Sequence, residues 1–361
     1  MSRPAVAYID QAAFSENIQF LQRQASNSEL LLVVKADAYG HGVENLLPAF
    51  KHHRVAVACV EEALTLIDLG YSGEVILLEG LFNSACVDKL RGHSAVFVIH
   101  SLFQLDCLEN AGYEGRVWLK VDSGMHRLGL NEDDFRDCLQ RIGKSKKMQL
   151  ETVMTHFASA DDPRSTSIST QVSRFHSVLS GSDANQLAQA PSLSLCNSAA
   201  LLLHPEFQEQ IVRPGIVLYG GNPVPLIPSV TDGLKPVMHL KSEVIALREI
   251  ETGETVGYGD TWTALRKTII ATVAMGYGDG YPRHAPSGTP VMVDGQRAPL
   301  VGRVSMDLIT IDVTEVRNVI IGSEVEFWGA ELSIDEVAEH AGTISYQLCT
   351  AITARVPRVC I

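Results

Sequence analysis

The 361-residue sequence lacks long hydrophobic runs and lacks an excess of positive charge. No run approaches the ~18 apolar residues of a membrane-spanning helix, so no membrane association is expected. The stretch Met1–Phe14 lacks the apolar core of a secretory signal, because Asp10 interrupts its hydrophobic part. Lys and Arg number 29 against 42 Asp and Glu, and the resulting net charge of −13 argues against a nucleic-acid partner.

Cysteine is sparse and scattered. The seven cysteines are odd in number and include no C-x-x-C pair, which excludes an obvious disulfide framework or zinc site. We therefore expect reduced thiols, a cytoplasmic protein and no bound metal. The sequence also lacks a phosphate-binding P-loop, a G-x-S-x-G nucleophile motif and an H-E-x-x-H zinc motif. The run from Gly276 to Gly280 has the wrong glycine spacing for a dinucleotide loop.

Short apolar runs recur along the first two thirds of the chain, with helix-like segments such as Val60–Leu69 and Leu102–Asn110 between them. Runs rich in Val, Ile and Leu without polar alternation are typical of parallel strands covered on both faces. An open, doubly wound sheet fits this alternation too, but the count of eight favours an α/β fold of the (β/α)8 TIM-barrel type. The eight runs are Leu30–Val34, Val55–Val60, Val75–Leu78, Ala95–Ile99, Val117–Val121, Leu150–Thr155, Leu193–Cys196 and Gln210–Arg213.

The pattern changes after a proline- and glycine-rich stretch at residues 221–236. We expect a barrel over residues 1–234 and a smaller, mainly-β C-terminal domain over residues 235–361. Asp294-Gly295 is a hairpin signal between two of its strands, and Ser333 with Glu336 predicts a capped helix. The expected strands are Val244–Ile250, Thr268–Met275, Pro290–Val293, Arg297–Val301 and Leu308–Val313.

Polar residues follow several of the eight runs, at the carboxyl ends of strands where barrels place their active sites. They are Lys35, Lys120, Asp122, His156, Asn197, Ser198 and Arg213. Burial at a strand end favours the neutral amine of Lys35, and a neutral amine can form a Schiff base with a carbonyl. Lys35 alone could equally be a surface lysine that follows a core strand.

Seven motifs in order make the whole chain resemble the alanine racemase family. They lie at residues 34–42, 122–129, 155–158, 212–216, 256–262, 276–283 and 302–307. The resemblance implies a barrel followed by a β domain, a head-to-tail homodimer with shared active sites, and the cofactor pyridoxal 5'-phosphate. It also implies interconversion of L- and D-alanine, with D-alanine supplied for peptidoglycan.

The resemblance assigns two bases to opposite faces of the substrate. Lys35 matches the lysine that carries the cofactor and later acts as one base, and Tyr258 matches the second base, which the other subunit supplies. Arg213 matches the residue facing the pyridine nitrogen of the cofactor. His156 matches a hydrogen-bond partner of Tyr258 and Arg213, and it is expected to supply a positive electrostatic influence at the site. Those that match phosphate-binding positions are Tyr39, Ser198, Gly215, Ile216 and Tyr346.

Further residues match substrate-binding and corridor positions. Arg127 and the backbone of Met306 match contacts to the substrate carboxylate, Met306 again from the other subunit. Lys120 matches a lysine that is carbamylated in many relatives and then orients Arg127. The residues that match a narrow corridor into the site are Asp161, Tyr277, Arg283, Arg303 and Asp307.

Each residue also has an ordinary structural reading. Ser198 could cap a helix, Arg213 could pair with a carboxylate, and Tyr258 could be an aromatic residue in a glycine-flanked turn. Two alternative functions stay open at the level of sequence. One is a broad-specificity amino-acid racemase of the same fold, and the other is a non-catalytic pyridoxal-phosphate carrier, against which the presence of Tyr258 argues.

Overall fold

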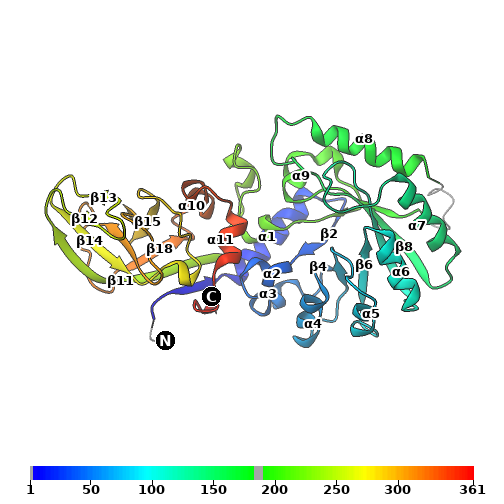
Figure 1. The fold of residues 1–361 in the computed structure, drawn as a ribbon, viewed down its shortest axis with the longest axis horizontal. Helices are drawn as coiled ribbons and strands as arrows, with labels where there is room; N and C mark the ends of the chain where they lie inside the picture. Colours follow the sequence, from blue (N-terminus) through cyan, green and yellow to red (C-terminus); the bar gives the residue numbers. More distant parts are fainter. Residues whose placement is uncertain (1–2, 183–189) are drawn as a thin grey trace.

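The computed structural model describes residues 3–182 and 190–361. The chain forms two lobes, one in which helices surround strands and one rich in β-strands (Figure 1). This arrangement confirms the predicted barrel followed by a mainly-β part. In the described part of the chain, no helix combines the length and the apolar character needed to cross a membrane.

Eight parallel strand positions close the barrel. Strand β10 (Ile211–Val212) pairs with β2 (Glu29–Leu30), and a bridge between Asn197 and Arg213 joins it to the preceding strand. Because β2 runs into β3 after one residue, the circle is complete. The other seven strands follow in chain order as β3 (Leu32–Val33), β4 (Val55–Val57), β5 (Val75–Leu77), β6 (Ala95–Ile99), β7 (Gly115–Lys120), β8 (Met148–Met154) and β9 (Ser192–Ser194).

The strands and helices of this lobe agree with their sequence patterns. All residues of β4 and β5 are buried, as expected for strands covered on both faces. Asn131 caps α7 by accepting a hydrogen bond from Asp134 N at 2.9 Å. The helices are α1 (Gln11–Gln24), α3 (Val43–Phe50), α4 (Val60–Asp68), α5 (Ala85–Lys89), α6 (Leu102–Asn110), α7 (Glu132–Lys144), α8 (Ser167–Ser180) and α9 (Ser198–Leu203).

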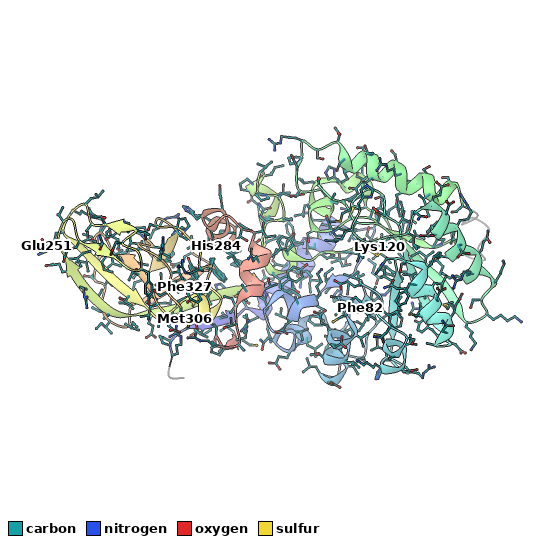
Figure 2. All side chains as sticks on the ribbon, viewed as in Figure 1. Phe82, Lys120, Glu251, His284, Met306 and Phe327 are labelled. Atoms are coloured by element: carbon teal, nitrogen blue, oxygen red, sulfur yellow. The ribbon has the colours of Figure 1, made fainter. Side chains whose placement is uncertain are left out.

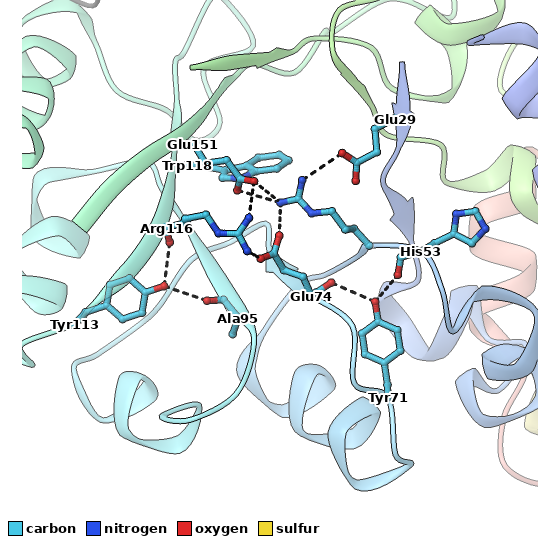
Figure 3. A network of polar contacts seen from close by, with 10 residues as sticks. Glu29, His53, Tyr71, Glu74, Ala95, Tyr113, Arg116, Trp118 and Glu151 are labelled. Carbon is cyan, nitrogen blue, oxygen red and sulfur yellow. Dashed lines mark hydrogen bonds and ion pairs between the residues drawn. The ribbon is translucent and has the colours of Figure 1, made fainter. Parts of the chain in front are cut away.

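An ion network fills the end of the barrel where the strands begin (Figure 3). Arg54 and Arg116 both pair with the buried carboxylate of Glu74. Both arginines also lie 3.0 Å from Glu151, which accepts a 2.8 Å hydrogen bond from the Trp118 indole. This end of the barrel is opposite the strand ends that carry Lys35 and Arg213. The network therefore stabilises the barrel and is not part of the candidate active site.

The second lobe is built around the long strand β11 (Met238–Ile250). Its neighbours include β1 (Val6–Ile9), so the first strand of the chain lies in this sheet and not in the barrel, which sequence reasoning did not predict. The remaining elements are β12 (Thr255–Val256), β13 (Trp262–Thr263), β14 (Thr268–Val273), β15 (Pro290–Val293), β16 (Gln296–Pro299), β17 (Ile309–Asp312), β18 (Glu324–Trp328), β19 (Arg358–Cys360), α10 (Ile334–Ala341) and α11 (Ser345–Ala351).

The predicted turn and helix of this lobe are present. Asp294 and Gly295 have φ of 44° and 73° and join β15 to β16, as a two-residue hairpin requires. Ser333 Oγ caps α10 by accepting from Asp335 N at 3.2 Å. Glu336 does not complete the capping pattern, because its carboxylate pairs with Arg297 of β16 instead.

Candidate active site

Lys35 stands where β3 ends, and the chain then makes a left-handed turn, α2 (Lys35–Tyr39). The φ angles of Ala36, Asp37, Ala38 and Tyr39 lie between 52° and 54°. Residues other than glycine seldom adopt this region, and a run of four is held only by surrounding contacts. The turn leaves Lys35 half-buried at the rim and carries Tyr39 into the interior.

Four of the five predicted phosphate-binding residues, Tyr39, Ser198, Gly215 and Ile216, lie next to one another. Gly215 N donates to Ser198 Oγ at 2.8 Å, and Ile216 follows directly in a 3₁₀ turn. A Cβ atom at Gly215 would lie 2.5 Å from the Tyr39 hydroxyl, so the hydroxyl has room here because residue 215 has no side chain. Ser198 also begins helix α9, whose cap is Asn197, and its hydroxyl faces Gly215.

Tyr346 reaches the same place from the other lobe. It lies on α11, and its ring centroid is 6.0 Å from that of Tyr39, which stacks on Tyr219 at 4.8 Å. Burial raises the pKa of both Tyr39 and Tyr346 well above the ordinary tyrosine value. Both hydroxyls are therefore neutral donors near neutral pH, which suits an anionic group.

Arg213 is a buried cation whose hydrogen-bond partners, among the described residues, are neutral groups. Its guanidinium donates to Thr155 O at 2.7 Å, to Ser194 O at 2.8 Å and to Ser194 Oγ at 2.7 Å. Among the residues that the structure describes, no carboxylate pairs with it, so the alternative of a structural Arg–carboxylate pair is wrong. Burial lowers the pKa of Arg213 to about 10, which leaves it charged near neutral pH.

His156 lies beside Arg213, with Nδ1 at 3.5 Å from Nη2. Burial, and then the positive charges of Arg213, Lys120, Arg127 and Lys35, lower the pKa of His156 well below its ordinary value. The ring is therefore neutral near pH 7. This corrects the expectation of positive influence from His156, because the positive charge here is on Arg213.

Lys120 is 6% exposed and lies among other cations. Burial, followed by the charges of Arg213, Arg127 and Lys35, lowers its pKa to about 8. The carboxylate of Glu79, after β5, acts in the opposite direction but is the smallest contribution. The strand ends thus concentrate positive charge in one place, which favours anionic ligands.

The remaining predicted residues are mostly on the second lobe. Tyr258 is 70% exposed in a turn flanked by Gly257 and Gly259, with φ of 79° and 75°. Figure 2 shows Met306 in this lobe and Lys120 in the barrel. Tyr258 and Met306 are exposed, and within the described residues neither forms a hydrogen bond or ion pair with Lys35.

The corridor residues do not gather in one place within the chain. The Arg303 guanidinium lies close to Gly259, beside Tyr258, and Asp307 pairs with Arg355 at 2.7 Å. Tyr277 and Arg283 are exposed on the second lobe. Asp161 is exposed on the barrel lobe, near enough to Tyr346 to contribute to its raised pKa.

Sequence reasoning missed two polar side chains that support the site. Gln171 of α8 is buried, donates to His156 O at 3.1 Å and accepts from Ala158 N at 2.9 Å. Glu62 of α4 accepts a 2.8 Å hydrogen bond from Ala36 N, next to Lys35. Two features of the sequence could have pointed to these residues. Gln171 is an amide on the buried face of a helix, and Glu62 is an acidic residue in the first turn of a predicted helix.

Comparison with known proteins agrees with this geometry. Residues 9–223 match the family model for the alanine racemase N-terminal domain, and residues 237–360 match that for the C-terminal domain. The chain belongs to the alanine racemase family. It is an isomerase that interconverts L- and D-alanine.

Similar members of the alanine racemase family cover almost the whole chain. It is 44% identical over 360 residues to the catabolic alanine racemase of Pseudomonas putida, covering 99% of this chain and 98% of that one. It is 45% identical over 370 residues to alanine racemase of Chromohalobacter salexigens, with the same coverages. Biosynthetic alanine racemase from Pseudomonas aeruginosa has a similar structure, with TM-score 0.92, 40% identity and 99% coverage of both chains.

Proposed function

We propose that this chain racemises alanine with pyridoxal 5'-phosphate held in the barrel, using Lys35 and the Tyr258 of a second copy as bases on opposite faces of the substrate. The observation that carries this proposal is Arg213, a buried cation without a carboxylate partner among the described residues, at the strand ends beside Lys35 and the Tyr39 cradle. This arrangement suits racemisation better than other chemistry of the same cofactor.

The residues present fit the cofactor. Tyr39, Ser198 and Tyr346 supply neutral hydroxyls and Gly215 leaves room beside them, which suits a phosphate group. The backbone of Ile216 completes the cradle, and Lys35 Nζ supplies the covalent attachment. A relative from Bartonella henselae, with TM-score 0.89, 28% identity and 99% coverage of both chains, has covalently bound pyridoxal phosphate.

When bound, the cofactor withdraws electrons from the Cα–H bond of alanine and makes this proton acidic. Arg213 would face the pyridine nitrogen and, as a cation, would disfavour protonation of that nitrogen. This role of Arg213 would weaken the electron withdrawal and favour prompt return of a proton to Cα. The neutral ring of His156 can accept a hydrogen bond from the Arg213 guanidinium, and it adds no second positive charge to the site.

Inversion at Cα needs a base on each face, since one base alone returns the proton to the side it left. Tyr258 is exposed on the second lobe, where its hydroxyl is free to enter the site of another copy. We therefore infer a homodimer with shared sites, in which Met306 also comes from the partner chain. Arg127, near Lys120 and Lys35, binds the substrate carboxylate.

Lys120 is a suitable site for carbamylation. Its lowered pKa leaves part of the amine neutral at pH 8, and only a neutral amine reacts with CO2. The carbamate anion would balance the surrounding cations and orient Arg127.

Asp161, Tyr277, Arg283, Arg303 and Asp307 line the corridor in this proposal. A narrow corridor restricts the substrate to alanine, and rates on serine, lysine and arginine distinguish this from a broad-specificity racemase.

The division between residues 234 and 235 and a cytoplasmic location also belong to the proposal. The cytoplasmic location is supported by the seven cysteines, which are all free, because reduced thiols are typical of that compartment.

The test is Lys35→Ala, with Lys144→Ala at the exposed end of α7 as a control. Lys35→Ala is expected to lose the visible absorption band of lysine-linked cofactor and all measurable racemisation, while the control keeps both. Lys35→Ala protein that retains the band would contradict the assignment of Lys35.

A further inference from the structure

The turn after Lys35 requires external support. Four consecutive residues have φ near 53°, in the left-handed region that residues other than glycine seldom adopt. The segment therefore keeps this shape only where neighbouring groups fix it. Since Lys35 is its first residue, the direction in which the lysine leaves the strand depends on the same contacts.

Glu62 fixes the beginning of this turn. Its Oε1 accepts from Ala36 N at 2.8 Å, the first peptide N–H after Lys35. Its Oε2 accepts from Ala58 N at 2.7 Å, just after β4. Because β3 and β4 are neighbours in the barrel, one carboxylate joins the ends of two adjacent strands to α4.

A backbone hydrogen bond from Ala38 N to Val34 O at 2.9 Å also closes the first part of the turn, whereas the other supporting side chains contact its later part. Asp37 Oδ1 accepts from Val43 N at 2.7 Å, and the His41 ring lies 3.0 Å from the carbonyl oxygens of Ala38 and Tyr39. Arg358 of β19 donates to Gly40 O at 3.1 Å. Among the described contacts, Glu62 is thus the side chain that holds the peptide adjacent to Lys35.

We propose that Glu62 is a positioning residue for Lys35: its carboxylate holds the Ala36 amide in the left-handed turn and thereby fixes where the lysine amine meets cofactor and substrate. This inference rests on the proposed function of Lys35. An alternative reading is that Glu62 only caps α4, since Ala58 N precedes that helix. The two readings differ in their effect on Lys35.

The experiment compares Glu62→Gln with Glu61→Gln in the holoenzyme. A glutamine has one acceptor oxygen, so one of the two bonds is lost while size is kept. Glu61 is in the same first turn of α4 but is exposed and pairs with Lys89, so it controls for charge near the helix start. The readouts are pyridoxal-phosphate affinity, visible circular dichroism per bound cofactor, kcat, KM for alanine and the thermal midpoint.

Glu62→Gln is expected to weaken cofactor affinity and lower kcat by about tenfold each, with little change in KM. The visible circular dichroism is expected to fall, and Glu61→Gln to match wild type. Ala36→Gly added to Glu62→Gln should restore most of the signal and kcat, because glycine adopts positive φ without steric penalty. If Glu62→Gln does not fold, Glu62→Asp, whose shorter side chain cannot reach both amides, carries the same expectation.

Wild-type affinity, dichroism and kcat in Glu62→Gln would overturn the inference, as would a loss confined to the thermal midpoint. Failure of Ala36→Gly to restore the signal would also overturn it. These outcomes are separate from failure of the proposed function, which is decided by whether Lys35→Ala keeps the absorption band. If Lys35→Ala loses the band and Glu62→Gln behaves as wild type, only the positioning role is wrong.

Discussion

The guanidinium of Arg213 lies 3.5 Å from Nδ1 of His156, and the two groups carry one positive charge between them. Arg213 stays charged because its pKa of about 10 is above neutral pH, and burial beside it keeps His156 neutral. The site therefore presents a fixed cation that neither a histidine proton nor a carboxylate compensates, in the part of the chain that the structure describes.

Replacing Arg213 by glutamine removes this charge and keeps a hydrogen-bond donor. We expect racemisation to slow and the share of turnovers that end in transamination to rise roughly tenfold, which corresponds to about one pKa unit at the cofactor nitrogen. Pyruvate formed from alanine measures that share. An unchanged ratio of pyruvate to inverted alanine would show that the Arg213 charge does not decide the outcome.

We expect carbamylation of Lys120 to depend on pH. Its amine becomes neutral as pH rises through about 8, so uptake of CO2 should increase over this interval and be small well below it. Carbon-13 NMR with labelled bicarbonate measures the carbamate signal. The signal should be absent in Lys120→Met, and an equal signal in that variant would assign the modification to another amine.

Gly215→Ala tests the phosphate cradle. The added Cβ would lie 2.5 Å from the Tyr39 hydroxyl, and such overpacking corresponds to roughly a tenfold to hundredfold loss of cofactor affinity. Gly181→Ala, at the end of α8 and away from the strand-end site, is the control and should bind the cofactor as wild type does. Equal affinity in the two variants would mean that the phosphate binds elsewhere.

The ion network at the opposite end of the barrel predicts an effect on stability alone. Glu74→Gln leaves Arg54 and Arg116 without their shared buried partner and should lower the free energy of unfolding by about 2–4 kcal/mol. Glu114→Gln, which breaks an exposed pair with Lys147, should leave the free energy of unfolding almost unchanged, because water screens this pair. Denaturant unfolding measures both, and a changed KM for alanine in Glu74→Gln would contradict a purely structural role.

The barrel could be predicted because its strands are buried on both faces and therefore appear as apolar runs, of which Val55–Val57 and Val75–Leu77 are examples. The place of β1 could not, since four residues carry too little pattern to choose between two sheets. The left-handed turn was also hidden. Ala36–Tyr39 contains no glycine, and long-range contacts from Glu62 and Arg358 impose its shape.

The sequence predicts the positions of the candidate site residues more fully than their charge states. Lys35, Ser198 and Arg213 follow strand runs, so their positions were readable from the sequence. The neutral state of His156 was not, because it depends on burial and on cations from three other strand ends.

The most direct test of the shared site mixes two inactive variants, Lys35→Ala and Tyr258→Phe, under conditions of demonstrated subunit exchange. Half of the dimers then contain one copy of each, and a site that takes Lys35 from one chain and Tyr258 from the other is intact once in each mixed dimer. With shared sites, about a quarter of wild-type racemisation should be recovered. If both bases came from the same chain, no site would be intact, and the absence of any recovered activity would contradict a shared site.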